Sequence, residues 1–188
     1  TALGRLIQAR AITQGKILLA GPSDTISLKK LIEKLEKNID LILIDGALSR
    51  KTFGSPSITQ AMILSTGASL SASLNVVVKK TKFIYQMTKL PQYEGKFAEQ
   101  LQQIENGIYA ITDEGIKDLQ IPSLMMIDKY KDKIFACGKK LFVAGALNDK
   151  FIQFLKIQKN PQEIEIIIKD FTKIFSNEDN TLQYLSKG

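Results

Sequence analysis

One pattern recurs at four places in this chain: an apolar run, then a glycine, then alanine or proline, then a polar residue that can cap a helix. The copies are LLAGPSD, LIDGALS, LSTGASLS and FVAGALND, at unequal spacings that exclude a solenoid repeat. Glycine lets the backbone turn tightly, and a following helix N-terminus favours an anion. Strand-to-helix turns in an open α/β sheet lie where ligands bind. We therefore take Gly21, Gly46, Gly67 and Gly145 as candidate ligand-binding residues.

The first third of the chain predicts a βαβ unit after an N-terminal β-hairpin. Residues 4–12 and 16–20 read as the hairpin, with a helix over residues 4–12 as the alternative. Apolar residues then recur at spacings of three and four, and they predict a helix ending near residue 37, with Ser23 or Asp24 as its cap. Residues 41–44 are continuously apolar, which predicts a strand covered on both faces.

The rest of the chain continues the alternation. A helix is expected to begin at Ser69, Ser71 or Ser73 and to end just before Pro91. Further helices are expected over 93–106, after Pro122, over 151–155 with Asn148 or Asp149 as cap, and over 180–185. Strands are expected at 108–112, 139–145 and 164–168, and residues 171–175 are expected to turn back. This order predicts an α/β fold in one domain over residues 1–188, with a mainly parallel sheet flanked by helices. The layout is that of a P-loop NTPase without a Walker A motif.

Composition narrows the class of protein. The chain has 188 residues, 44% of them hydrophobic, which is enough to bury a core. No apolar run approaches the roughly 20 residues that span a bilayer. The single cysteine, Cys137, has no internal disulfide partner and is expected to be a buried small residue in a reducing cytoplasm. The absence of histidine removes imidazole catalysis and the usual zinc ligand sets, so we expect no self-contained hydrolytic enzyme.

The charge is basic. The net charge of +7 comes from 26 basic and 19 acidic residues, and most of the basic residues are lysines scattered along expected helix faces. No recognised nucleic-acid-binding motif accompanies them, so the sequence disfavours a nucleic-acid partner. A basic surface equally suits an acidic protein or a phosphate.

Asp45 ends the apolar run LILID in the manner of a Walker B strand, where an acid holds magnesium with a nucleotide. The alternative is an aspartate that only ends the strand or caps a turn. No G-x-x-x-x-G-K-[ST] occurs, and QGKI lacks both the first glycine and the terminal hydroxyl. Magnesium-ATP is therefore a candidate cofactor, and Asp45 would hold magnesium only together with a nucleotide. One alternative is a divergent P-loop-type domain whose phosphate loop lies outside the chain.

A polar loop, SRKTFGSPSITQ, follows the Asp45 turn. Ser49, Arg50 and Lys51 in this loop could hold a phosphate or carboxylate through charge-assisted hydrogen bonds. The alternative is a solvated loop in which Ser57 or Thr59 caps a helix. The acid pair at residues 113 and 114 has turn-like surroundings, so we expect an exposed turn there.

The motifs LLAGPSD, IDGALSRKTFGSP, ILSTGAS and NVVVKKT together resemble the lysine 5,6-aminomutase reactivase subunit family of bacteria. The resemblance covers roughly residues 4–90, and IIIKDFTKIF matches more loosely. Family members look longer, so the resemblance implies a chain truncated at both ends. It also implies a non-catalytic, chaperone-like accessory subunit. Such a subunit acts with a MutS-like ATPase partner to exchange damaged cobalamin on an adenosylcobalamin-dependent aminomutase.

Overall fold

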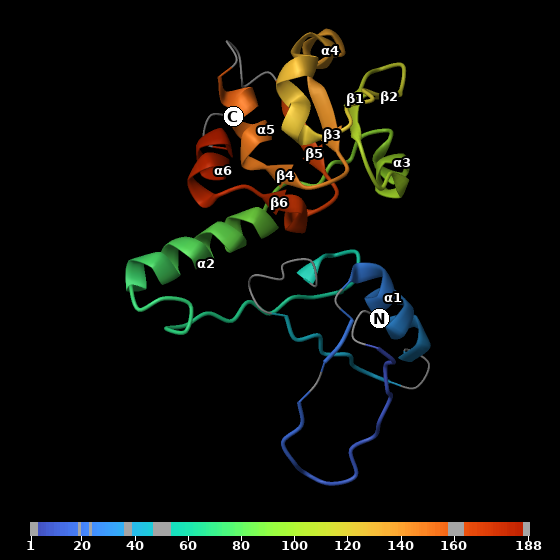
Figure 1. Ribbon diagram of the computed structural model, residues 1–188, viewed down its shortest axis with the longest axis vertical. Helices are drawn as coiled ribbons and strands as arrows, with labels where there is room; N and C mark the ends of the chain where they lie inside the picture. The colour runs from blue at the N-terminus through green and yellow to red at the C-terminus, as the bar shows by residue number, and fades with distance from the viewer. Residues whose placement is uncertain are drawn as a thin grey trace. The chain divides into compact units, whose positions relative to one another are not determined.

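The computed structural model describes residues 4–18, 20–22, 24–35, 39–46, 54–157 and 164–185 (Figure 1). The chain divides into two units, Thr1–Met62 and Ile63–Gly188. The single-domain organisation stays a prediction.

The first unit contains helix α1, Thr25–Leu35. The Oδ1 atom of Asp24 accepts a hydrogen bond from the backbone N–H of Ser27 at 2.7 Å, which confirms the predicted cap. Further along, Ser55 is buried, and its Oγ accepts from the N–H of Ser57 at 3.2 Å. The hydroxyl of Thr59 donates to the carbonyl of Ser55, also at 3.2 Å, so this serine and threonine segment forms a turn fastened by its own side chains.

Two strand predictions in the first unit are wrong. The described residues among 4–22 form no strand, so the N-terminal hairpin is not found there. Residues 41–44 also form no strand, and the side chains of Leu41 and Leu43 are 72% and 81% exposed instead of covered on both faces. An apolar run alone does not form a strand, because its backbone N–H and C=O groups need a neighbouring strand as hydrogen-bond partner. The described part of this unit supplies no such neighbour.

The second unit holds the remaining helices. They are α2 Leu74–Thr88, α3 Ala98–Gln103, the 3-10 helix η3 Leu124–Tyr130, α4 Lys131–Ala136, α5 Asp149–Lys156, the 3-10 helix η5 Phe171–Lys173 and α6 Glu178–Leu185. As predicted, α2 ends before Pro91, and Asn148 caps α5 by accepting from the N–H of Phe151 at 3.0 Å. Helix α3 is shorter than the predicted 93–106, because Tyr93 folds against Gly95 and glycine is a poor helix former.

A four-stranded mixed sheet lies at the centre of the second unit, in the order β2-β1-β3-β5. The strands are β1 Ile108–Ile111, β2 Ile116–Asp118, β3 Lys140–Val143 and β5 Glu165–Ile168. Strand β1 pairs antiparallel with both β2 and β3, and only β3 and β5 are parallel. The prediction of a mainly parallel sheet is therefore confirmed only in part. The short turn after β1 reverses the chain at once and gives the antiparallel pair with β2, whereas in the described residues α5 lies in the connection between the parallel strands β3 and β5.

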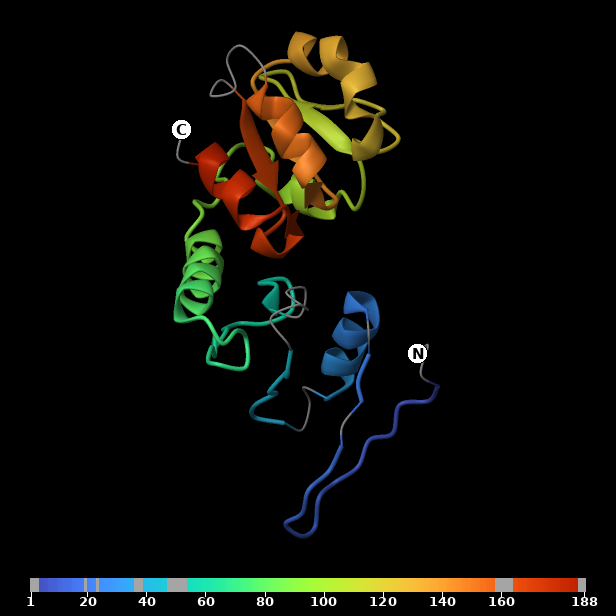
Figure 2. The same cartoon turned by 60° about the vertical axis from the view of Figure 1, so that its left-hand side comes forward.

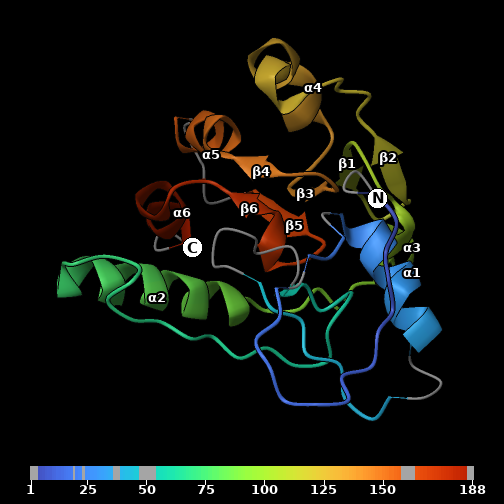
Figure 3. The same ribbon diagram turned by 60° about the horizontal axis from the view of Figure 1, so that its bottom comes forward.

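Both faces of this sheet are covered. On one face, Phe142, Ile111 and Ile167 pack with Leu101 of α3 in a buried apolar cluster. The other face carries fully buried side chains such as Leu141, and Figure 2 shows α5 lying across it. Beside the sheet, β4 Leu147–Asn148 and β6 Ile174–Phe175 form a second, two-stranded parallel sheet (Figure 3). This architecture confirms a mixed α/β fold. Helix α6 is the last helix in the described residues.

Candidate functional site

The predicted site residues do not all belong to one unit of the structure. Gly21, Asp45 and Gly46 belong to the first unit, Gly67 and Gly145 belong to the second, and Ser49, Arg50 and Lys51 lie outside the described residues. Among the residues that the structure describes, only the turn at Gly145 follows a longer strand, β3, and leads through β4 into a helix, α5. Gly67 precedes α2 but follows no strand. Within the described residues these glycines therefore do not form one edge of a sheet.

Asp45 is exposed and follows residues 41–44, which alternate between exposed and half-buried and have no strand structure. The strand-end placement of a Walker B acid is thus not found at this residue. No group of three or more histidine, cysteine, aspartate or glutamate side chains is placed to hold a metal ion in the described part of the chain. Magnesium binding at Asp45 stays a prediction.

The two less specific predictions have different outcomes. Residues 113 and 114 are exposed in a turn that Thr112 and Gly115 close, with the N–H of Thr112 donating to the carbonyl of Gly115 at 3.0 Å. The predicted exposed turn is confirmed. Cys137, at the C-cap of α4, is partly exposed instead of buried.

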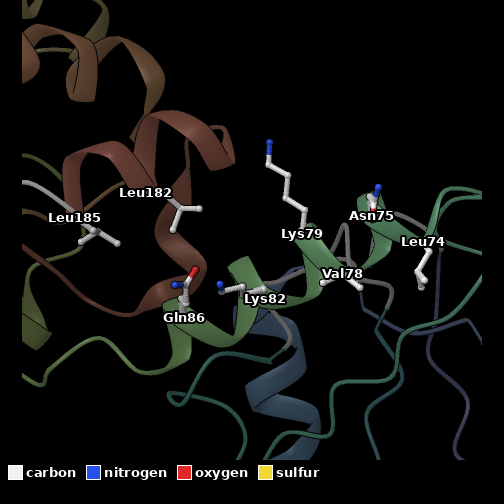
Figure 4. Close-up of a pocket in the computed structure, with 8 residues that line it drawn as sticks. All are labelled: Leu74, Asn75, Val78, Lys79, Lys82, Gln86, Leu182 and Leu185. Atoms are coloured by element: carbon white, nitrogen blue, oxygen red, sulfur yellow. The ribbon is translucent and has the colours of Figure 1, made fainter.

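A groove of about 650 Å³ lies between α2 and α6 in the second unit (Figure 4). Its walls are Leu74, Asn75, Val78, Lys79, Lys82 and Gln86 from α2, and Leu182 and Leu185 from α6. In Figure 4, Gln86 extends its side chain toward Leu182 across the groove. We name this surface the α2–α6 groove.

Helix α2 has two apolar faces. Val77, Phe83, Ile84 and Met87 are buried and form the first. Leu74, Val78 and Tyr85 form the second, and these three side chains are 74%, 55% and 57% exposed. At about 100° per residue the three lie on one stripe of the helix. One apolar stripe suffices for a helix on the surface of a protein, so the exposed stripe offers contact area to another molecule.

The α6 wall is held in place by hydrogen bonds to the rest of the second unit. The Oδ1 atom of Asp149 in α5 accepts from Ser176 Oγ at 2.7 Å, from the N–H of Asn177 at 3.0 Å and from Asn180 Nδ2 at 2.8 Å. The hydroxyl of Tyr184 donates to the carbonyl of Ile164 at 2.6 Å. These bonds order the α6 wall before any partner arrives, which lowers the entropic cost of binding.

An ion pair joins the two walls. Lys79 Nζ in α2 lies 2.8 Å from Asp179 Oδ1 in α6. The hydrogen bond from Lys79 to Asp179 raises the pKa of the lysine above its ordinary value of 10.5. Both side chains are at least half exposed, so the pair orients the helices more than it stabilises them.

The groove carries one positive charge without an ion pair in the described residues, that of Lys82, because Lys79 is paired with Asp179. Its charged wall residues are Lys79 and Lys82, and no acid is among the wall residues. Lys82 Nζ has no carboxylate within 4.0 Å in the described residues. The Oε1 atom of Gln86 is buried and has no hydrogen-bond partner there either. The groove thus combines exposed leucines with a lysine that has no ion pair and an acceptor that has no donor in the described residues. Its wall residues include no nucleophile beside a base.

The groove is not among the sequence predictions, although one sequence pattern indicates the exposed apolar stripe beside it. The run NVVVKKT places apolar residues on two sides of a helix, so that Val77 is buried while Val78 is exposed. A helical-wheel count over residues 74–88 would have shown the second stripe.

No family model, curated protein sequence or solved structure matches the chain. None of the helices in the described ranges is both long and apolar enough to cross a bilayer.

Proposed function

We propose that this chain is a protein-binding accessory subunit of an aminomutase reactivase. In this proposal it acts with a MutS-like ATPase partner on an adenosylcobalamin-dependent amino-acid aminomutase, and the two exchange damaged cobalamin for intact cofactor. The observation that carries the proposal is the exposed apolar stripe of α2 beside the α2–α6 groove, a surface suited to contact with another protein.

The chemistry of the chain supports binding over catalysis. Without histidine the chain lacks the commonest general base, and the groove presents amines, an amide and leucines. The resemblance of LLAGPSD and IDGALSRKTFGSP to reactivase subunits supplies the finer part of the proposal, the identity of the partners.

The physical task of such a subunit is a population shift. An effector moves a two-state equilibrium only by its difference in affinity for the two states. A shift from 1:99 to 99:1 requires about a 10⁴-fold preference for the cofactor-releasing state. A rigid, amphipathic docking surface that fits one state of the mutase is the kind of device that creates this difference.

The test is a reactivation assay. An aminomutase inactivated by turnover is mixed with its ATPase partner, magnesium-ATP and free adenosylcobalamin, with and without this chain. We expect activity to return only when both the chain and the ATPase are present. Equal recovery without the chain, or no recovery with it, would contradict the proposal.

Nucleotide hydrolysis belongs to the ATPase partner in this proposal. Titration calorimetry of the full chain with magnesium-ATP tests for a nucleotide site, which the accessory role does not require. Binding that disappears in Asp45→Ala would instead favour the alternative, a divergent P-loop-type nucleotide-binding domain.

A further inference from the structure

We infer that the α2–α6 groove binds an amphipathic α-helix of a partner protein, one with acidic side chains beside its apolar stripe. The inference rests on the proposed function, because it names the partner segment that an accessory subunit of this kind would hold.

The shape of the groove favours a helix as the occupant. Its long wall runs along α2 from Leu74 to Gln86, a span of about 18 Å at about 1.5 Å per residue. Leu74, Val78, Lys82 and Gln86 follow one another at intervals of four residues and form one ridge. A partner helix of about three turns would match this length, and side chains at positions i, i+3, i+4 and i+7 would contact the leucines of both walls.

The charge of the groove selects the partner. Lys82 is exposed and has no ion pair among the described residues, and α2 contains no acidic residue. An acidic side chain on the incoming helix would meet this amine at the groove's rim. A second copy docked through the same surface would bring another Lys82 and no acid from its groove walls, since Lys79 is already paired with Asp179. An acidic partner therefore fits better than self-association.

Gln86 adds a directional contact. Its Oε1 atom is buried without a hydrogen-bond partner in the described residues, and Figure 4 shows the side chain extended toward Leu182. A buried acceptor without a partner is unfavourable, so a donor from the occupant would improve binding at this end of the groove. Serine, threonine or asparagine on the partner helix would supply it.

The experiment is a selection from a displayed library of helical peptides against the full chain. We expect the selected peptides to share apolar residues at helical spacing with aspartate or glutamate beside them. One selected peptide is then synthesised, and its Kd is measured by fluorescence anisotropy. Val78→Asp should weaken binding about tenfold or more, since it places a charge where an apolar contact forms. Lys82→Glu should weaken binding about threefold to tenfold.

Two matched controls separate the groove from general effects. Lys133→Glu changes an exposed lysine of α4 to the same acid outside the groove and should leave the Kd within about twofold. A peptide whose acids are replaced by lysine should bind Lys82→Glu better than wild type, because the charges then match. Circular dichroism spectra confirm that each variant is folded.

Several outcomes would overturn the inference. Selected peptides that are basic or lack helical spacing would do so, as would a Kd unchanged by Val78→Asp. Self-association in sedimentation that Val78→Asp abolishes would assign the groove to a second copy. Binding to phosphatidylserine vesicles that the same variant abolishes would assign it to a lipid surface.

The reactivation assay separates this inference from the proposed function. If reactivation occurs and is unchanged by Val78→Asp and Lys82→Glu, the proposed function stands and the groove inference falls. If the variants weaken peptide binding as expected but the chain restores no aminomutase, the groove chemistry stands and the proposed function falls.

Discussion

The carboxylate of Asp149, in the first turn of α5, accepts a hydrogen bond from the side-chain amide of Asn180 in α6 at 2.8 Å. The same oxygen accepts from Ser176 and from the backbone of Asn177. One carboxylate oxygen thus fastens the start of the last helix to the central crossover helix. Because α6 forms one wall of the α2–α6 groove, this contact connects the core of the second unit to the proposed docking surface.

Asp149→Ala should loosen α6 and destabilise the protein by about 2–3 kcal/mol, because it leaves three donors without their acceptor. Urea unfolding measures the loss. Asp179→Ala is the control, because that carboxylate is exposed and pairs only with Lys79; its effect should be much smaller. Equal losses in the two variants would contradict the anchoring role.

Stability should also fall in acid through Asp149. Burial raises the pKa of this carboxyl, but hydrogen bonds from Asn180, Ser176 and Asn177 outweigh burial and hold the pKa below its ordinary value of 3.8. A lowered folded-state pKa contributes stability above the unfolded value, and this contribution is lost as the pH falls below about 4. The free energy of unfolding of the wild type should therefore lose the Asp149 contribution as the pH falls from about 5. The Asp149→Ala variant lacks this carboxylate, so its free energy of unfolding should not show that loss.

The phenol of Tyr184 should ionise at a higher pH than an ordinary tyrosine. Burial raises the pKa of its phenol to about 12. Because the unfolded phenol ionises near its ordinary value of 10.0, the contribution of Tyr184 is fully present below pH 10 and is lost as the pH rises toward 12. Tyr184→Phe should remove the late step from the absorbance titration at 295 nm (roughly the phenolate band) and cost about 1–2 kcal/mol, since it leaves the carbonyl of Ile164 without this donor.

Two glycines with similar backbone angles should respond differently to alanine. Gly107 has φ +105°, and an added Cβ would lie 2.8 Å from Cε2 of Tyr109. Gly138 has φ +115° with nothing within 4 Å of an added Cβ. Gly138→Ala should cost about 1 kcal/mol from backbone strain alone, and Gly107→Ala should cost more, because the tyrosine ring must move as well. Thermal unfolding compares them, and equal melting temperatures would count against the crowding at Gly107.

Adjacent valines of α2 test its two faces. Val77 is 8% exposed and Val78 is 55% exposed. Val77→Ala should destabilise the protein by about 1–2 kcal/mol through lost burial, whereas Val78→Ala should change stability by less than about 0.5 kcal/mol. Denaturant unfolding measures both. A large loss at Val78 would mean that the exposed stripe already packs within the protein, and it would leave no free stripe for a partner.

Much of the second unit was predictable from local pattern. The runs that became β1, β3 and β5 are short and apolar between turn residues, and the cap at Asn148 is a typical helix start. Strand β2, with the sequence IKD, carries no such pattern, because its residues lie at a partly exposed sheet edge. Its place in the sheet comes from the turn at Thr112 and Gly115, which folds it back on β1.

The candidate site was less predictable. The glycine turns were expected to meet at one sheet edge, but only Gly145 follows a described strand. The groove depends on α6 lying beside α2, and these helices are about 90 residues apart in sequence. No local signal specifies which distant helix forms the second wall.

The sequence by itself determined where α2, α5 and the strands β1, β3 and β5 of the second unit form, and it determined that imidazole chemistry is absent. Both follow from the residues and their immediate neighbours. Only the tertiary structure decided that the sheet is mixed, that Leu41 and Leu43 are exposed, and which stripe of α2 stays uncovered. Strand direction and burial depend on which distant segment packs against a given face, and apolar periodicity specifies only that a face exists.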